Sequence, residues 1–230
     1  MIRSVCIVFV VLFALAVPAN AGPVEDGLAA AQRGDYPTAL KLWRPLAEEG
    51  YADAQYNLGV MYRNGDGVLQ DYAEAMKWFR KAAEQGEAQA QHNLGVMYQQ
   101  GQGVPQHYAE AVRWFRLAAE QGHSPAQNNL GVMYHNGEGV VKDFAEAERW
   151  FRQAAKQGEA QAQQSLEYLY ASGKGVPEDF VQAYMWSIVA VASGSKAAQE
   201  NRDLLAKRMT PDQIAEAQRM AREWMAEHQQ

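Results

Sequence analysis

One hexapeptide repeats at a constant interval and constrains the fold more than any other feature of this sequence. NLGVMY occupies residues 57–62, 93–98 and 129–134, so each copy begins 36 residues after the previous one. The same interval separates three sets of glycine and aromatic residues: Gly50, Gly86, Gly122, Gly158 and Gly194; Trp78, Trp114, Trp150 and Trp186; Tyr62, Tyr98, Tyr134 and Tyr170. A fixed period of this length is typical of a solenoid, in which stacked helix pairs bury apolar faces that a single pair leaves exposed.

Each unit is predicted to contain two helices, called helix A and helix B. In the first full unit, residues 52–65 and 71–86 both place apolar side chains at the three- and four-residue spacing of one helix face. Asp71 stands where an N-cap side chain accepts backbone N–H bonds, and Gly65 and Gly86 stand where a left-handed residue ends a helix. The local sequence therefore predicts both helices and their ends.

The glycine inside the hexapeptide needs a packing explanation. Gly59, Gly95 and Gly131 each cost about 1 kcal/mol relative to alanine inside a helix. We expect a neighbouring helix to press against helix A at these positions, where no side chain stands in the way. The fourth unit reads SLEYLY, with Glu167 in place of the glycine, so its contact is expected to be looser or differently packed.

The two ends of the repeat array differ from its middle. Residues 22–50 lack the long loop between helices and are predicted to form an N-terminal, tetratricopeptide-type capping pair. Repeats are assigned to residues 51–201, and residues 202–230 to a C-terminal capping region. Thr210-Pro211-Asp212-Gln213 reads as a capping box with proline at the first helical position. The last helix places five apolar residues on one side: Ile214, Ala217, Ala221, Trp224 and Met225.

The combined motif resembles the Sel1-like repeat family, which is related to tetratricopeptide repeats but has a longer loop between its two helices. The resemblance lies in helix A (AQYNLGVMY), the loop GDGVLQDY and helix B (AEAMKWFRKAAEQG), with later loops GQGVPQHY, GEGVVKDF and GKGVPEDF. It covers about residues 24–201 and implies an all-α, right-handed superhelical solenoid of antiparallel helix pairs. The ending MTPDQIAEAQRMAREW also resembles exported bacterial members of the family.

The first 21 residues are predicted to be a cleavable signal peptide. Arg3 precedes an uncharged apolar run of 13 residues, 5–17, and Ala19-Asn20-Ala21 forms an A-x-A cleavage site before Gly22. The alternative is an uncleaved anchor, but the run is shorter than the roughly 20 residues that cross a bilayer. The only cysteine, Cys6, would be removed with this segment, so the mature chain is expected to be periplasmic or secreted and free of disulfides.

Charge and motifs argue against several function classes. Without Arg3, 20 basic side chains stand against 27 acidic ones, which disfavours nucleic acid or an anionic membrane as a partner. The G-x-G-V loops lack the lysine and hydroxyl residue of a phosphate-binding loop, so they are interpreted as interhelical turns. His92 and His135 lie on one side of adjacent A helices, but zinc normally takes at least three protein ligands. We therefore predict no catalytic residues, no metal site and no cofactor.

Other repeated positions are assigned structural roles. The Trp-Phe pairs at 78–79, 114–115 and 150–151 are expected to fill the core. Glu74, Glu110 and Glu146 are interpreted as a solvated face of helix B rather than as catalytic carboxylates. The nearly constant asparagines Asn57, Asn93 and Asn129 are expected to make hydrogen bonds between helices.

Positions that vary between units are the candidates for recognition. Two such columns lie seven residues apart on helix A and so share one face. In stacks of this type the A helices line the concave surface, so we predict partner binding by seven residues there: Tyr56, Arg63, His92, Gln99, Asn128, His135 and Gln164. The alternative is that these are merely surface positions that tolerate change.

The sequence favours a non-enzymatic scaffold or adaptor that holds a peptide or protein partner in the concave groove. The family resemblance implies the same role, because its members commonly serve as adaptors in protein complexes, envelope maintenance and host interaction. The alternative is a protein that binds cell-wall fragments or β-lactams with weak hydrolase activity, as suggested for cysteine-rich relatives. Those relatives carry a disulfide in each repeat, whereas this mature chain is expected to have none.

Overall fold

The computed structural model describes residues 22–228, so the predicted signal peptide, with Cys6, lies outside the described residues. This part of the chain contains twelve α-helices and no strand. Their bounds are α1 (Pro23–Gln32), α2 (Tyr36–Glu49), α3 (Ala52–Asn64), α4 (Tyr72–Glu84), α5 (Ala88–Gln100), α6 (Tyr108–Glu120), α7 (Ser124–Asn136), α8 (Phe144–Lys156), α9 (Ala160–Ser172), α10 (Phe180–Ala192), α11 (Lys196–Ala206) and α12 (Pro211–His228).

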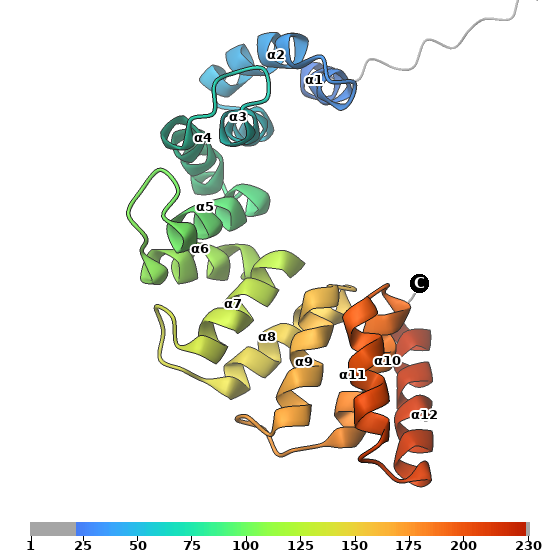
Figure 1. Cartoon of the computed structure of the whole chain (residues 1–230). Coiled ribbons are helices and arrows are strands. Elements are labelled where there is room, and N and C mark those ends of the chain that lie inside the picture. Colours follow the sequence, from blue (N-terminus) through green and yellow to red (C-terminus); the bar gives the residue numbers. More distant parts are fainter. Residues whose placement is uncertain (1–21, 229–230) are drawn as a thin grey trace, which may run out of the picture.

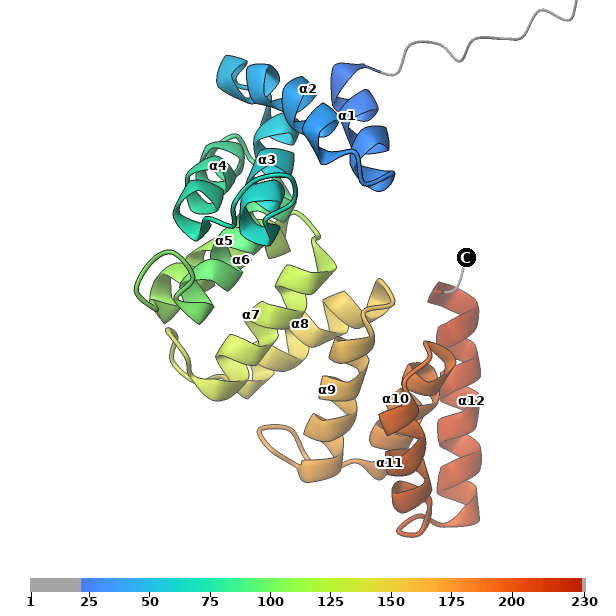
Figure 2. The same cartoon turned by 45° about the horizontal axis from the view of Figure 1, so that its top comes forward.

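The helices form a stack of antiparallel pairs that curves into an open arch (Figure 1). Each helix packs on the one before it and the one after it in sequence, from α1 to α11. The A helices α3, α5 and α7 lie toward the inside of the arch, while α4 lies toward the outside in both views (Figures 1 and 2). The predicted all-α solenoid of helix pairs is confirmed.

The core is continuous because each unit lends a tryptophan to the unit before it. Trp114 of α6 is buried in the cluster that contains Phe79 of α4 and Leu94 of α5. In the same way, Trp78 is buried in the cluster that contains Trp43 and Leu58, and Trp150 is buried in the cluster that contains Phe115 and Leu130. The predicted core role of the Trp-Phe pairs is confirmed, and it explains why one unit cannot complete its own core.

The hexapeptide glycine gives room to a phenyl ring of the same pair. A Cβ atom at Gly59 would lie 2.7 Å from Phe79 Cδ1, and one at Gly95 would lie 2.5 Å from Phe115 Cδ1. Gly131 faces Phe151 in the same way. The expected close approach is confirmed, and the group that makes it is the aromatic ring of helix B.

The fourth unit exchanges both partners of this contact. Glu167 of α9 replaces the glycine, and Ser187 of α10 stands 20 residues later, at the position that Phe151 has in the preceding unit. Both residues are buried, with Glu167 4% exposed. A large side chain on helix A thus accompanies a small one on helix B, so the expected difference in packing is confirmed.

The loops after the A helices are interhelical turns, as predicted. Gly65 ends α3 in the left-handed region with φ 83°, where a residue with a side chain would be strained. The second loop glycine serves close packing, because a Cβ atom at Gly103 would lie 2.8 Å from the backbone of Tyr72. Asp71 caps α4 by accepting hydrogen bonds from the backbone N–H groups of Ala73 and Glu74, at 2.9 and 3.0 Å.

Buried glutamines connect neighbouring units. Gln91 Nε2 of α5 donates to the carbonyl of Ala83 at 3.1 Å, and Gln91 Oε1 accepts from Gln121 at 2.7 Å. Gln55 and Gln127 repeat the arrangement. The series of bonds ends at Gln163, whose Oε1 is buried without a hydrogen-bond partner in the described residues. In the preceding units the donor is a glutamine at the end of helix B, and the equivalent residue here is Ser193.

A second repeated contact joins helix B to the next helix A. Arg80, Arg116 and Arg152 each donate to the phenol oxygen of the tyrosine 18 residues later, at 2.6, 2.7 and 2.5 Å. On helix B itself, Glu74, Glu110 and Glu146 pair with a lysine or arginine three residues later, on side chains more than a third exposed. These glutamates form the predicted solvated face.

The C-terminal helix closes the stack. α12 packs on α10, where the Trp224 and Trp186 rings meet at a centroid distance of 5.3 Å. The capping box is confirmed, because Thr210 N donates to Gln213 Oε1 at 2.9 Å and Gln213 N donates to Thr210 Oγ1 at 3.3 Å. The expected boundary after residue 201 falls inside α11. Among the described helices, none has the length and apolar character needed to cross a bilayer.

Candidate partner-binding face

The A helices α3, α5, α7, α9 and α11 form what we call the inner face. Three hollows lie between neighbouring helices of this face, each lined by residues of two A helices. The first lies between α3 and α5, the second between α7 and α9, and the third between α9 and α11, with volumes of about 500, 320 and 240 Å³. The inner face therefore offers a row of concave sites.

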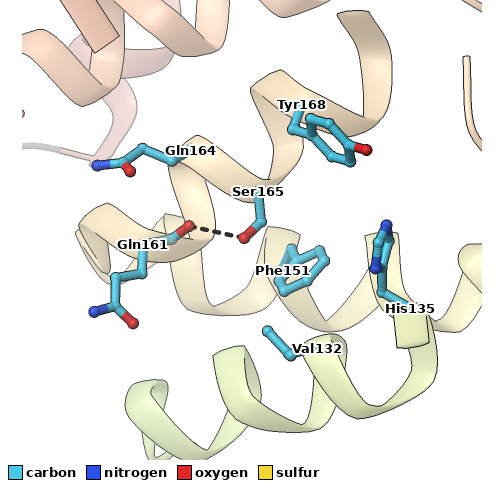
Figure 3. Close-up of a pocket in the computed structure, with 7 residues that line it drawn as sticks. All are labelled: Val132, His135, Phe151, Gln161, Gln164, Ser165 and Tyr168. Carbon is cyan, nitrogen blue, oxygen red and sulfur yellow. Dashed lines mark hydrogen bonds between the residues drawn. The ribbon is translucent and has the colours of Figure 1, made fainter. Parts of the chain in front are cut away.

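The hollow between α7 and α9 combines an apolar floor with polar ends (Figure 3). Its lining is Val132, His135, Phe151, Gln161, Gln164, Ser165 and Tyr168. Figure 3 shows Phe151 between Val132 and Tyr168, with the amides of Gln161 and Gln164 at the opposite end from His135. His135 Nδ1 lies 2.9 Å from Asn136 Oδ1, while its Nε2 is buried and has no hydrogen-bond partner in the described residues. This nitrogen can accept or donate one hydrogen bond to a ligand.

The hollow between α3 and α5 is more polar. Arg63 reaches across it and donates to the side-chain oxygen of Asn93, and its guanidinium carbon lies 5.9 Å from the Phe79 ring centroid. Val96 and Met97 supply the apolar part of the lining. This end of the inner face carries a half-buried positive charge held by a neighbouring unit.

The hollow between α9 and α11 contains a buried acid. Its walls are Tyr168, Ala171, Leu204 and Leu205, with Asn201 and Arg208 completing the lining around Glu167. Burial raises the pKa of Glu167 to about 7, and a hydrogen bond from Asn201 offsets part of that rise. Tyr168 and Leu204 are 47% and 60% exposed, so large apolar groups stand open beside this acid.

The first four predicted recognition residues lie on the inner face and contact neighbouring units. Tyr56 packs against Phe79 at a ring-centroid distance of 5.8 Å, and Arg63 reaches Asn93. His92 Nε2 lies 3.1 Å from Asn129 Nδ2, and Gln99 Nε2 lies 3.5 Å from Met133 Sδ. All four are half-buried.

The other three show the same behaviour. Asn128 is buried and donates to Gln161 at 3.4 Å, while Gln164 donates to Ser195 Oγ at 2.8 Å. His135 packs edge-on against Tyr168 at 6.0 Å between ring centroids. The structure brings His135 and Gln164 together at one hollow and places Arg63 at another, so the seven residues form no single cluster.

Asn93 and Asn129 make bonds between A helices, as predicted, through Arg63 and His92. For Asn57 no side-chain bond is found among the described residues, whereas Ser165, the next residue in this column, donates to Gln161 O within its own helix at 2.9 Å. The interhelical role therefore holds for two of the units.

Two histidines of this face, His92 and His123, pack against each other. The His92 and His123 rings lie 4.9 Å apart between centroids, and burial together with the His123 charge lowers the pKa of His92 to about 4. His135 lies elsewhere, beside Phe144 and Tyr168. In residues 22–228, no group of three or more histidine, cysteine, aspartate or glutamate side chains is arranged to hold a metal ion.

The sequence reasoning missed three residues of the inner face: Glu167, Tyr168 and Leu204. The signal for Glu167 was its position in the glycine column, which was interpreted only as a packing change. Tyr168 follows it in SLEYLY and replaces the valine of NLGVMY, so the same departure from the repeat marks both residues. Leu204 lies outside the repeated motif, and nothing in the periodicity pointed to it.

A model of the Sel1 repeat matches five consecutive segments, residues 19–51, 52–87, 88–123, 124–159 and 158–195, which together span most of the chain. This chain belongs to the Sel1 repeat family. No curated protein matches it. The 36-residue helix pairs, the G-x-G loops and the Gly-Phe contact described above are therefore features of its Sel1 repeats.

Two solved structures share both sequence and fold with the chain. A Sel1 repeat protein from Oxalobacter formigenes is 32% identical with a TM-score of 0.77, over 89% of this chain and 83% of that one. A protective antigen of uropathogenic Escherichia coli is 38% identical with a TM-score of 0.79, over 87% of this chain. This chain spans only 45% of that antigen's structure.

A more distant likeness concerns the fold alone. The immunity protein PA5088 from Pseudomonas aeruginosa is 18% identical with a TM-score of 0.56, over 91% of this chain and 84% of that one.

Sel1 repeat proteins generally act as scaffolds for protein–protein interactions, and this solenoid has that architecture.

Proposed function

We propose that this Sel1 repeat protein is a non-enzymatic adaptor of the bacterial cell envelope that binds a peptide segment of a protein partner along its inner face. The observation that carries the proposal is the set of three hollows on the inner face, between α3 and α5, between α7 and α9, and between α9 and α11. Each hollow combines apolar lining with side-chain amides, a histidine or a charged group. An extended peptide running across the A helices could place some of its side chains into these three hollows.

The stack is suited to this task because its inner face is ordered before the partner arrives. The glutamine ladder, the Arg-Tyr contacts and the bonds between A helices fix the spacing of neighbouring units. A surface that is already rigid loses little conformational entropy on binding, which leaves more of the contact energy as affinity. Some of the residues predicted for recognition take part in these contacts between units, as Arg63 does with Asn93 and Gln164 with Ser195.

The envelope location rests on sequence and on a relative. The predicted signal peptide, residues 1–21, would carry the mature chain out of the cytoplasm. The Escherichia coli relative, of whose structure this chain spans 45%, is described as a protective antigen. Both points favour export of this chain.

Site-specific photo-crosslinking tests the proposal. p-Benzoylphenylalanine is placed at Tyr168 on the inner face and, as a matched control, at Leu69, which is 92% exposed in the loop before α4. In cells that make the protein naturally, irradiation is expected to give one discrete adduct from position 168, recovered in the envelope fraction, and none from position 69. Adducts from position 69 alone would show that the partner binds at the loops between paired helices and not on the inner face. Adducts confined to the cytoplasmic fraction would contradict the location.

A further inference from the structure

Glu167 is the most unusual polar residue of the described structure. It is 4% exposed, and its Oε2 atom is buried without a hydrogen-bond partner in the described residues. In the preceding units this position is glycine, so neither the repeat nor the helix requires an acid here. A buried carboxylate oxygen without a partner is unfavourable for folding, which sets Glu167 apart from residues that stabilise the stack through their hydrogen bonds.

The surroundings of Glu167 define the shape and polarity of a ligand. The carboxylate lies at a hollow of about 240 Å³ between α9 and α11. Tyr168, Leu204 and Leu205 provide apolar walls, and the first two of these are open to solvent. A hollow with apolar walls and a carboxylate in its lining matches a side chain with an apolar stem and a cationic tip.

The positive charges close to this hollow belong to other contacts. Arg208 lies 3.7 Å from Glu178 and stacks over the Phe180 ring at 4.2 Å. Lys174 donates to the phenol oxygen of Tyr168 at 2.5 Å. Neither makes a salt bridge with Glu167, so the described residues leave its carboxylate without a cationic partner.

We propose that the hollow between α9 and α11 is a subsite for a lysine side chain of the partner, with the methylenes against Tyr168 and Leu204 and the ammonium at Glu167 Oε2. This inference rests on the proposed function, because the hollow continues the inner face. Lysine fits better than arginine, since one free carboxylate oxygen suits a compact ammonium, whereas a guanidinium fork pairs best with two.

The test uses n-butylammonium, which reproduces the lysine side chain, and n-butanol, which keeps the stem without the charge. The full mature protein is labelled with 13C at glutamate carboxyl carbons, and the amine is titrated at neutral pH while NMR follows Glu167. We expect a saturable shift of the Glu167 signal with n-butylammonium and none with n-butanol. Absence of a saturable shift, or equal shifts with both compounds, overturns the proposal.

Variants separate binding from folding. Glu167→Gln should weaken n-butylammonium binding about tenfold, followed by backbone amide signals of α9 and α11. Glu84→Gln, which removes an exposed acid at the end of α4 and away from the hollow, should leave the affinity unchanged. Tyr168→Ala serves if Glu167→Gln unfolds, because it opens one wall and keeps the acid, and weaker binding is again expected. Unchanged affinity in a folded Glu167→Gln protein, or in the Tyr168→Ala protein, refutes the subsite.

The outcome is independent of partner capture. If crosslinking at position 168 succeeds but the amine fails to bind, the adaptor function stands and the lysine subsite falls. If the amine binds at Glu167 but no partner is crosslinked, an amine-binding site stands, while the proposed function and the assignment of the site to a partner's lysine fall.

Discussion

Replacing Gly95 with alanine tests the packing explanation of the repeated hexapeptide. A Cβ atom there would lie 2.5 Å from both Cδ1 and Cε1 of Phe115, whereas carbon atoms pack best about 3.5–4.0 Å apart. Phe115 is fully buried, so its ring has little room to withdraw. Overpacking costs about 1–3 kcal/mol, and two such short contacts favour the upper end of that range.

The substitution also brings a gain. Alanine is about 1 kcal/mol better than glycine inside a helix. We therefore expect a net loss of about 1–2 kcal/mol from Gly95→Ala, opposite in sign to the effect on an isolated helix. In a Phe115→Leu background the clash is relieved, so adding Gly95→Ala should become neutral or stabilising.

Urea unfolding of the four proteins, followed by circular dichroism, measures these differences. The midpoint is expected to fall for Gly95→Ala alone while the slope with urea stays constant, which shows that stability and not the unfolded state has changed. The double-mutant cycle should give a coupling of about 1 kcal/mol or more. A Gly95→Ala protein that is more stable than the parent would refute the reasoning.

Four further predictions concern the titration of two buried groups, helix capping and catalysis. Because the pKa of Glu167 is raised from 4.5 to about 7, the parent should lose about 3 kcal/mol of stability as pH rises through that window, and Glu167→Gln should abolish this term in urea titrations. The pKa of His92 is lowered from 6.5 to about 4, so stability should fall as pH drops below 6.5, and His92→Asn should flatten that slope. Asp71→Ala should cost about 1 kcal/mol in the same assay, because it removes the cap of α4. A chromogenic β-lactam and muropeptides should show no turnover with the mature protein, and turnover that an inner-face substitution abolishes would contradict the non-enzymatic role.

Most of the fold could be predicted because it depends on local sequence patterns. The period, the apolar helix faces, the Asp71 cap and the Thr210–Gln213 capping box all depend on residues a few positions apart. The identity of the group against Gly59 could not be predicted in the same way. It depends on how two helices are rotated about their axes, and that rotation places the Phe79 ring, rather than a backbone, at the glycine.

The candidate site was harder to predict, because a position can differ between units for two reasons. Its side chain can contact a partner, or it can contact a residue of the next unit that also differs. The variable columns on helix A were interpreted as recognition positions. In the structure these residues meet variable residues of the next unit, as Asn128 meets Gln161 and Gln164 meets Ser195. Pairs of this kind can change together without any partner. Their role in partner binding stays a prediction, while their role in spacing the A helices follows from the contacts.

Glu167 shows what a departure from a repeat can reveal. The sequence shows two replacements 20 residues apart in the fourth unit: Glu167 stands where the preceding units have glycine, and Ser187 stands where they have phenylalanine. The consequence for function was not visible, because the hollow is completed by Asn201 and Leu204 of α11. Only the superhelical stacking of α11 beside α9 brings these residues to the acid.

The most direct test of the central claim is the affinity of the crosslinked partner for two matched double variants. Tyr168→Ala with Leu204→Ala removes two exposed apolar side chains from the inner face, and Leu69→Ala with Val141→Ala removes two from the loop edge. Calorimetry is expected to show about tenfold or greater weakening for the inner-face pair and no change for the loop pair. Equal affinity for the parent and the inner-face variant, with weakening in the loop variant, would contradict the account.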